Sequence, residues 1–281
     1  MEKQANDRYM TALEEMYDQH LNGETDDVRS GVVCYRTKTI KAGDMLECIS
    51  YPVYKNRSDK RAMREKATGA AQQAVNRRNA VRRMERLVQA NFGKNAVIVT
   101  CTYEGVNPEA EEGEKQLDLY LARLRRAARK QGNELKYVAV TERASTGRIH
   151  HHMIVEGVDR DTAEGKWRQG YCNARRYQQR EGQFVGIVRY MLKYNSTQDQ
   201  LVSKRIRTSH NLVRPVETVS DHKISIRKME RMAEDMQEAG VQILQKVYAG
   251  YVMQERPEIR RSDFLPGAYL YARMWREASN A

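Results

Sequence analysis

The sequence predicts an α+β fold in which helices flank a central antiparallel sheet. Between residues 95 and 195, segments rich in β-branched and aromatic residues alternate with amphipathic segments in the order β, α, β, β, α. Only the residues RASTG, which include the turn-forming ASTG, separate the second and third β segments, so these two are expected to form an antiparallel hairpin. A compact sheet covered by helices follows from this order.

The expected elements of this central region are, in chain order, a strand at 95–103, a helix at 111–133, strands at 134–142 and 148–156, a short helix and loop at 158–171, and a helix at 182–195. The first helix carries Leu117, Leu121 and Leu124 on one side and Gly132 at its end. The last helix is indicated by the spacing of its apolar residues, which are Val185, Val188 and Leu192.

The flanking regions carry weaker signals. Residues 32–54 predict a hairpin around the turn KAGD, and residues 58–91 predict a basic helix with Val81, Met84 and Val88 in one stripe. A helical pattern covers 222–248, and the tail is expected to be a short strand or a surface segment. The chain thus divides into an N-terminal helix, hairpin and basic helix at 1–94, a core at 95–200, and a basic segment with a helical elaboration at 201–281.

The positive charge of the chain is concentrated in one stretch. The net charge is +12, and residues 55–94 alone hold 12 basic and 3 acidic residues. A polyanion such as nucleic acid is the natural partner of such a stretch, and a solvated helix face is the alternative. The candidate DNA-binding residues, in this stretch and in the later segment SKRIR, are Arg77, Arg78, Arg82, Arg83, Lys204, Arg205 and Arg207.

The composition also indicates the cellular setting. No apolar run approaches the roughly 20 residues of a membrane span, and the N-terminal segment has no signal-peptide core. The four cysteines are widely spaced and form no CxxC pair, so they are expected to be reduced thiols rather than zinc ligands or disulfides. A cytoplasmic protein without a membrane partner is therefore expected.

Three consecutive histidines lie in the third β segment. Side chains of a strand alternate between faces, so His150 and His152 project together and His151 projects to the other face. Glu142, across the short turn, is a candidate third ligand for one divalent cation. Imidazole and carboxylate donors suit Mg²⁺ or Mn²⁺, and zinc is also compatible with them. A structural histidine cluster without metal is the alternative reading.

Two tyrosines four residues apart share one face of the last predicted helix. They are Tyr190 and Tyr194, with Lys193 between them. A phenol with its ordinary pKa of about 10 is a poor nucleophile, and a metal ion or a lysine helps to stabilise the phenolate. Such a tyrosine can hold a transient phosphodiester to a cut strand. Simple packing is the alternative for a chain with 16 tyrosines.

These motifs, taken in order, resemble those of the HUH endonucleases, and among them the rolling-circle replication initiators of phages and small replicons. VIVTCTY resembles their first motif, HHH (150–152) their metal motif, and YMLKY (190–194) their tyrosine motif. The likeness covers residues 96–195. It departs from the family pattern at His151, where an apolar residue is usual, and at Thr197, where a lysine would follow Tyr194 by three residues.

The resemblance implies a function. His150, His152 and Glu142 would bind Mg²⁺ or Mn²⁺, Tyr190 would attack the DNA with Lys193 as its partner, and Tyr194 would serve as the second nucleophile. The enzyme would nick and rejoin single-stranded origin DNA through a 5′-phosphotyrosine in the cytoplasm of a bacterial host. No GxxxxGK[ST] motif is present, so a host helicase, together with a polymerase, is the expected partner. The alternatives are a relaxase, a transposase with the same chemistry, or a non-catalytic DNA-binding protein.

Overall fold

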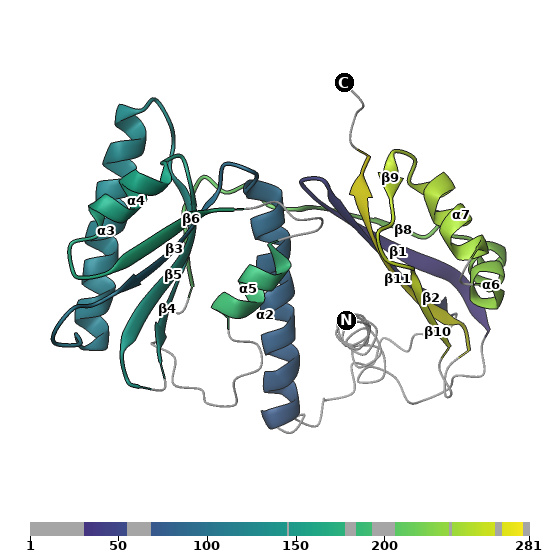
Figure 1. Ribbon diagram of the computed structural model, residues 1–281. Coiled ribbons are helices and arrows are strands. Elements are labelled where there is room, and N and C mark those ends of the chain that lie inside the picture. Colours follow the sequence, from purple (N-terminus) through teal and green to yellow (C-terminus); the bar gives the residue numbers. More distant parts are fainter. Residues whose placement is uncertain are drawn as a thin grey trace. The chain divides into compact units, whose positions relative to one another are not determined.

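The structure is a computed structural model that describes residues 31–54, 69–144, 146–177, 184–192, 206–235, 238–261 and 266–277 (Figure 1). The side chains of residues 69–78 and of Val185 are not among those described. The chain divides into two units. Residues up to 79 and from 215 onward form unit 1, and residues 80–214 form unit 2. The boundaries expected from the sequence were 94/95 and 200/201, whereas this division joins segments from both sides of unit 2 in unit 1.

Unit 2 is built on an antiparallel sheet with the strand order β6-β3-β5-β4-β7. Its strands are β3 (Val97–Thr102), β4 (Lys136–Arg143), β5 (Ile149–Glu156), β6 (Cys172–Arg176) and β7 (Ile206–Thr208). The predicted hairpin is confirmed as β4 and β5. Gly147 N–H donates to the carbonyl of Ala144 at 2.8 Å in its turn, and Gly147 adopts φ 79°, which favours glycine. The α+β class with a central antiparallel sheet is therefore confirmed.

Helices α3 (Ala110–Lys130) and α4 (Arg160–Lys166) cover one face of this sheet (Figure 1). The predicted stripe of Leu117, Leu121 and Leu124 is buried against it. Acidic residues in the first turn of α3 and basic residues in its last turn complement the helix dipole. The chain leaves the helix at Gly132, which adopts φ 73° and donates its N–H to the carbonyl of Arg129 at 3.1 Å.

Helices α2 (Gly69–Asn91) and α5 (Val185–Met191) pack on the opposite face (Figure 1). The stripe predicted for the basic helix is confirmed, because Val81, Met84 and Val88 are all buried. Asn91 closes this layer: its amide nitrogen donates to the carbonyl of Val213 at 2.7 Å, and its amide oxygen accepts from the Val213 N–H at 2.7 Å. The end of α2 is thus held to the last residues of unit 2.

Unit 1 contains a second antiparallel sheet, with the order β10-β11-β2-β1-β8 and with β9 paired to β11. The predicted hairpin is confirmed as β1 (Val32–Ala42) and β2 (Met45–Tyr54). The other strands come from the far end of the chain and are β8 (Val216–Ser220), β9 (Tyr251–Val252), β10 (Glu258–Arg261) and β11 (Ala268–Arg276). Helices α6 (Ile226–Glu234) and α7 (Ala239–Val247) pack on one face of this sheet (Figure 1).

Two expectations for the C-terminal region are corrected. The single helix predicted over 222–248 is broken at Asp235, because the Asp235 carboxylate accepts the N–H groups of Glu238 and Ala239 at 3.0 and 3.2 Å and so caps a new helix. For the tail, the short strand is confirmed and the surface segment is not. The tail forms β11, which lies between β10 and β2 and buries Leu270 and Met274. The region is part of a sheet rather than a purely helical elaboration.

The cysteines behave as the sequence predicts. All four are free thiols, and Cys48 and Cys101 are buried. Cys101 and Cys172 lie directly opposite each other on β3 and β6, with their sulfur atoms 3.4 Å apart. No helix in the described ranges is both long enough and apolar enough to cross a membrane.

The core of unit 2 generates a stability prediction. Leu124 is fully buried between α3 and the sheet, whereas Leu119 on the same helix is 50% exposed. We expect Leu124→Ala to lower the free energy of unfolding by about 2–5 kcal/mol, because it removes apolar contacts and leaves a cavity. Leu119→Ala should change it by less than about 0.5 kcal/mol. Urea unfolding followed by circular dichroism measures both, and equal losses would contradict the packing described.

Candidate functional site

The three histidines of β5 are divided between the two faces of the unit 2 sheet. In the antiparallel register, His150 lies opposite Glu142 of β4 and Thr102 of β3, and directly opposed residues project from the same face. His152, two residues further along β5, shares that face. The face that carries His150, His152 and Glu142 is called the histidine face below. It is the face on which α2 and α5 pack.

His152 and Glu142 lie next to each other on this face. The distance between His152 Nε2 and Glu142 Oε2 is 3.7 Å, and both side chains are 6% exposed. The rings of His150 and His152 are 6.3 Å apart between centroids. His150 is less deeply buried than its neighbours. An imidazole and a carboxylate therefore face each other on a largely buried surface, with a second imidazole next to them.

Thr100 is a site residue that the sequence reasoning missed. Its hydroxyl oxygen lies 3.2 Å from His152 Nδ1, and the two residues are directly opposed on β3 and β5. An imidazole that ligates a metal ion through Nε2 carries its proton on Nδ1 and donates it to a nearby oxygen. Thr100 is placed to accept that proton and to fix the ring. The available signal was its place in the first motif, but the register was needed to pair it with His152.

His151 faces the other side of the sheet and is part of the core there. Its Nε2 is 2.8 Å from the hydroxyl of Tyr103, and its Nδ1 is 3.0 Å from the hydroxyl of Thr141. The ring also makes an edge contact with Trp167, with centroids 5.7 Å apart. Burial lowers the pKa of His151 to about 3. A neutral, doubly hydrogen-bonded imidazole therefore occupies the position where an apolar residue was expected.

Helix α5 carries Tyr190 to the histidine face. The rings of Tyr190 and His152 meet edge to face with centroids 5.4 Å apart, although Tyr190 is 64% exposed. The helix is held by the buried side chains of Val188 and Met191. Arg189, which directly precedes Tyr190, forms an ion pair with Glu85 of α2 at 3.0 Å. A packed helix thus presents an exposed phenol next to the imidazole.

One family model matches the part of the chain that contains this site. Residues 96–199 match a model described as Replication-associated protein ORF2. This segment is similar to a rolling-circle replication initiator family. The resemblance inferred from the three motifs is thereby confirmed over these residues. No curated protein and no solved structure matches the chain.

Several residues predicted for this replication-associated segment and its flanks lie where the structure gives no side chain. Lys193, Tyr194, Lys204 and Arg205 fall outside the described residues. Arg77 and Arg78 belong to α2, but their side chains are not described. Arg82 is half-buried and Arg83 is exposed on the same helix. The roles assigned to these residues stay predictions.

Arg207 has a different environment from the one its predicted role requires. Its guanidinium donates to the carboxylates of Glu114 and Asp118, both on α3, and its side chain is 19% exposed. Two carboxylates that already neutralise this charge leave little of it for a phosphate. The structure therefore supports a role for Arg207 in joining β7 to α3 rather than in DNA binding.

The donor atoms of the histidine face can be compared with the requirements of a metal ion. Ligand atoms stand about 2.1 Å from a Mg²⁺ ion, so two of them lie at most about 4.2 Å apart. The 3.7 Å between His152 Nε2 and Glu142 Oε2 satisfies this limit. Among the described residues, no group of three or more His, Cys, Asp and Glu side chains is arranged to hold a metal. His152 and Glu142 therefore fit as two ligands of one ion, and His150 lies beside them on the same face.

The division of the histidines generates a stability prediction. His151→Ala should lower the free energy of unfolding by about 1–3 kcal/mol, because it leaves the buried hydroxyl of Thr141 without its imidazole partner. His150→Ala, at a less buried position, should cost less than about 0.5 kcal/mol. Urea unfolding of both variants provides the measurement. A larger loss for His150→Ala than for His151→Ala would show that the faces of β5 are assigned the wrong way round.

Proposed function

We propose that this protein is a rolling-circle replication initiator that cuts and rejoins single-stranded origin DNA, with Tyr190 as the nucleophile. The observation that carries the proposal is the contact between Tyr190 and His152, whose ring centroids are 5.4 Å apart. A tyrosine that served only to pack against the sheet would bury its ring, yet Tyr190 remains 64% exposed beside the imidazole and carboxylate. The family match over the same residues adds independent support.

The proposed reaction transfers one phosphodiester bond from the DNA to the protein. The phenolic oxygen of Tyr190 attacks the scissile phosphorus after losing its proton. A bond forms between that oxygen and phosphorus, and the bond from phosphorus to the 3′ oxygen of the preceding nucleotide breaks. The 3′ oxygen takes up a proton and becomes the hydroxyl that primes synthesis. The 5′ phosphate stays on the tyrosine, so the energy of the broken bond is conserved for rejoining.

We assign His152 and Glu142, with His150 as the third ligand, to a divalent cation such as Mg²⁺ or Mn²⁺. When bound, such an ion supplies positive charge beside the phosphate that is attacked. The protein's own contribution is to hold the donors in place. The hydroxyl of Thr100 orients the His152 ring, and the register of β4 and β5 keeps Glu142 on the same face. Neither His152 nor Glu142 can turn away, because both are largely buried.

The remaining parts of the proposal follow from the resemblance and the charge. Lys193 would assist Tyr190, and Tyr194 would take over the DNA in a second transfer. The basic stretch at 55–94 would hold the DNA backbone without reading its sequence. Unwinding would be supplied by a host helicase and synthesis by a host polymerase, in the cytoplasm of a bacterial host.

The nucleophile is tested by trapping the covalent intermediate. The protein is incubated with Mn²⁺ and single-stranded DNA from its own replicon, and the adduct is separated on a denaturing gel and mapped by peptide mass spectrometry. We expect the DNA to be linked to Tyr190. Tyr190→Phe and His152→Ala should each reduce adduct formation by at least about 100-fold, because they remove the attacking oxygen and a metal ligand. DNA binding should survive in both.

Tyr251→Phe and His222→Ala are the matched controls, since both residues belong to unit 1. Each should form adduct as the unchanged protein does. A link found only on Tyr194, with Tyr190→Phe fully active in cutting and joining, would refute the assignment of Tyr190. Absence of any adduct on all replicon strands tested would refute the proposed reaction itself.

The basic helix generates a second prediction. Replacing Arg77, Arg78, Arg82 and Arg83 by alanine should weaken DNA binding and flatten its salt dependence, because fewer counterions are released when fewer phosphates are neutralised. Each lost phosphate contact should reduce the slope of log affinity against log salt by about 0.7–0.9. Fluorescence anisotropy at salt concentrations from about 50 to about 200 mM measures the slope.

The control for this variant removes the same charge from a different helix. Four exposed basic residues near the end of α3 serve for it, and they are Arg125, Arg126, Arg129 and Lys130. Their replacement by alanine should leave the slope close to that of the unchanged protein. Equal effects from both variants would show that total charge, and not the basic helix, sets the affinity.

A further inference from the structure

Edge strand β6 extends the histidine face to the border of the unit 2 sheet. It pairs with β3 alone among the described strands, and on its other side the Ala174 N–H donates to the Glu164 carboxylate at 2.8 Å. Asn173 lies opposite Thr100, which in turn lies opposite His152. One row of side chains therefore runs from His152 across β3 to Asn173. Because opposed residues share a face, Asn173 belongs to the histidine face.

Two parallel rows flank this one. Arg175 lies opposite Ile98. Tyr171 continues the register on the other side, because the Thr102 N–H donates to its carbonyl at 2.8 Å and Thr102 lies opposite His150. Tyr171, Asn173 and Arg175 thus alternate with residues of the other face and stand about 6.6 Å apart along the strand. An extended nucleotide chain can match steps of this size.

All three side chains are open to solvent. Tyr171 is 69% exposed, and Asn173 and Arg175 are exposed as well. Arg175 makes no ion pair with a residue in the described ranges. A large exposed aromatic ring beside an exposed amide and an exposed guanidinium is a chemical set suited to nucleic acid, since bases stack on aromatic rings and phosphates bind arginine.

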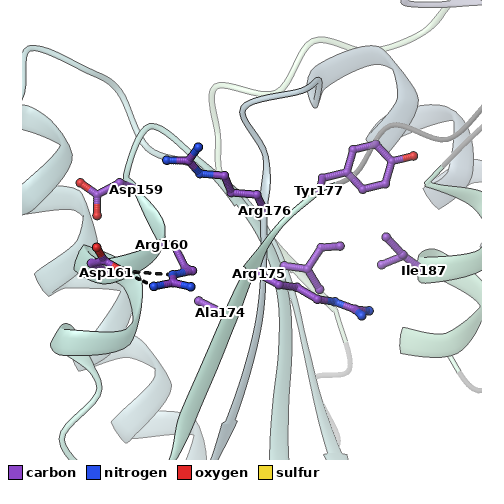
Figure 2. A pocket seen from close by; sticks show the side chains of 9 residues that line it. Asp159, Arg160, Asp161, Ala174, Arg175, Arg176, Tyr177 and Ile187 are labelled. Atoms are coloured by element: carbon purple, nitrogen blue, oxygen red, sulfur yellow. Dashed lines mark hydrogen bonds and ion pairs between the residues drawn. The ribbon is translucent and has the colours of Figure 1, made fainter.

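The surroundings of Arg175 connect this row to Tyr190. A hollow of about 670 Å³ lies at the edge of the sheet. Arg175, Ile98 and Ile187 of α5 line it, and its lining also includes Arg176, Asp159 and Asp161. Figure 2 shows that Arg175 extends toward Ile187, whereas Arg176 extends to the other side of the strand, where Asp159 and Asp161 lie. Tyr190 follows Ile187 by three residues and so lies on a similar side of α5. The side of α5 that lines the hollow thus also carries the candidate nucleophile.

We propose that Tyr171, Asn173 and Arg175 form a binding strip for single-stranded DNA that leads to the histidine face. Tyr171 stacks on an unpaired base, Asn173 hydrogen-bonds the strand, and Arg175 binds a phosphate. A single strand is the partner because stacking on a side chain requires a base that is free of its complementary strand. This inference rests on the proposed function, since it places the scissile strand across the same face as Tyr190.

The test measures binding of a fluorescent single-stranded oligonucleotide by anisotropy, with EDTA present so that no cutting occurs. Tyr171→Ala should weaken binding by about 5- to 150-fold, the range expected for one lost stacking contact. Tyr171→Phe should retain most of the affinity because it keeps the ring. Arg175→Ala should weaken binding and lower the slope of log affinity against log salt by about 0.7, as expected for one phosphate contact to a single strand.

Arg176→Ala is the matched control, because it removes the same charge from the adjacent position and the opposite side of the strand (Figure 2). It should bind as the unchanged protein does. Equal weakening by Arg175→Ala and Arg176→Ala, or unchanged binding by Tyr171→Ala, would overturn the strip. If the unchanged protein forms the Tyr190 adduct while the strip variants bind normally, this inference fails and the proposed function stands. If the strip variants lose binding and the unchanged protein forms no adduct, the strip stands and the proposed reaction fails.

Discussion

The alternation of side chains along β5 is the constraint on which the rest of unit 2 depends. His151 fits its pocket only because Tyr103 and Thr141 satisfy both of its ring nitrogens. That arrangement turns His150 and His152 to the opposite face. A slip of one residue in the pairing would exchange the two sets and place two imidazoles in the core without partners. The hydrogen bonds of His151 therefore help to keep His150 and His152 on the other face of the sheet.

The layer on the histidine face covers the apolar residues of β4 and β5, and it covers most of His152 and Glu142 as well. Tyr190 differs from them: α5 buries Val188 and Met191 over the sheet while Tyr190 stays exposed. The ion pair between Arg189 and Glu85 ties α5 to α2, whose own stripe covers the remaining apolar surface.

Much of unit 2 could be predicted from the sequence because its signals are local. The apolar stripe of α3, the turn at Gly147 and the alternation of β5 depend on residues close together in the chain. Pairings between distant segments could not be predicted in this way. Neither Thr100 beside His152 nor the carboxylates around Arg207 leave a local pattern. The helix break at Asp235 was missed because its capping bonds compete with a continuous apolar period. The place of β11 inside a sheet was missed because β2, one of its two partner strands there, lies more than 200 residues away.

The split composition of unit 1 has a consequence for the order in which the protein folds during its synthesis. Unit 2 is continuous from Ala80 to Arg214, so every strand of its sheet has been made before β8 begins at Val216. The hairpin of β1 and β2 is made first, yet it has to wait for β8 on one side and β11 on the other. During that interval both of its edges are unpaired, which is the state most open to association with other chains. A nascent chain therefore completes unit 2 while the outer edges of β1 and β2 are still unpaired.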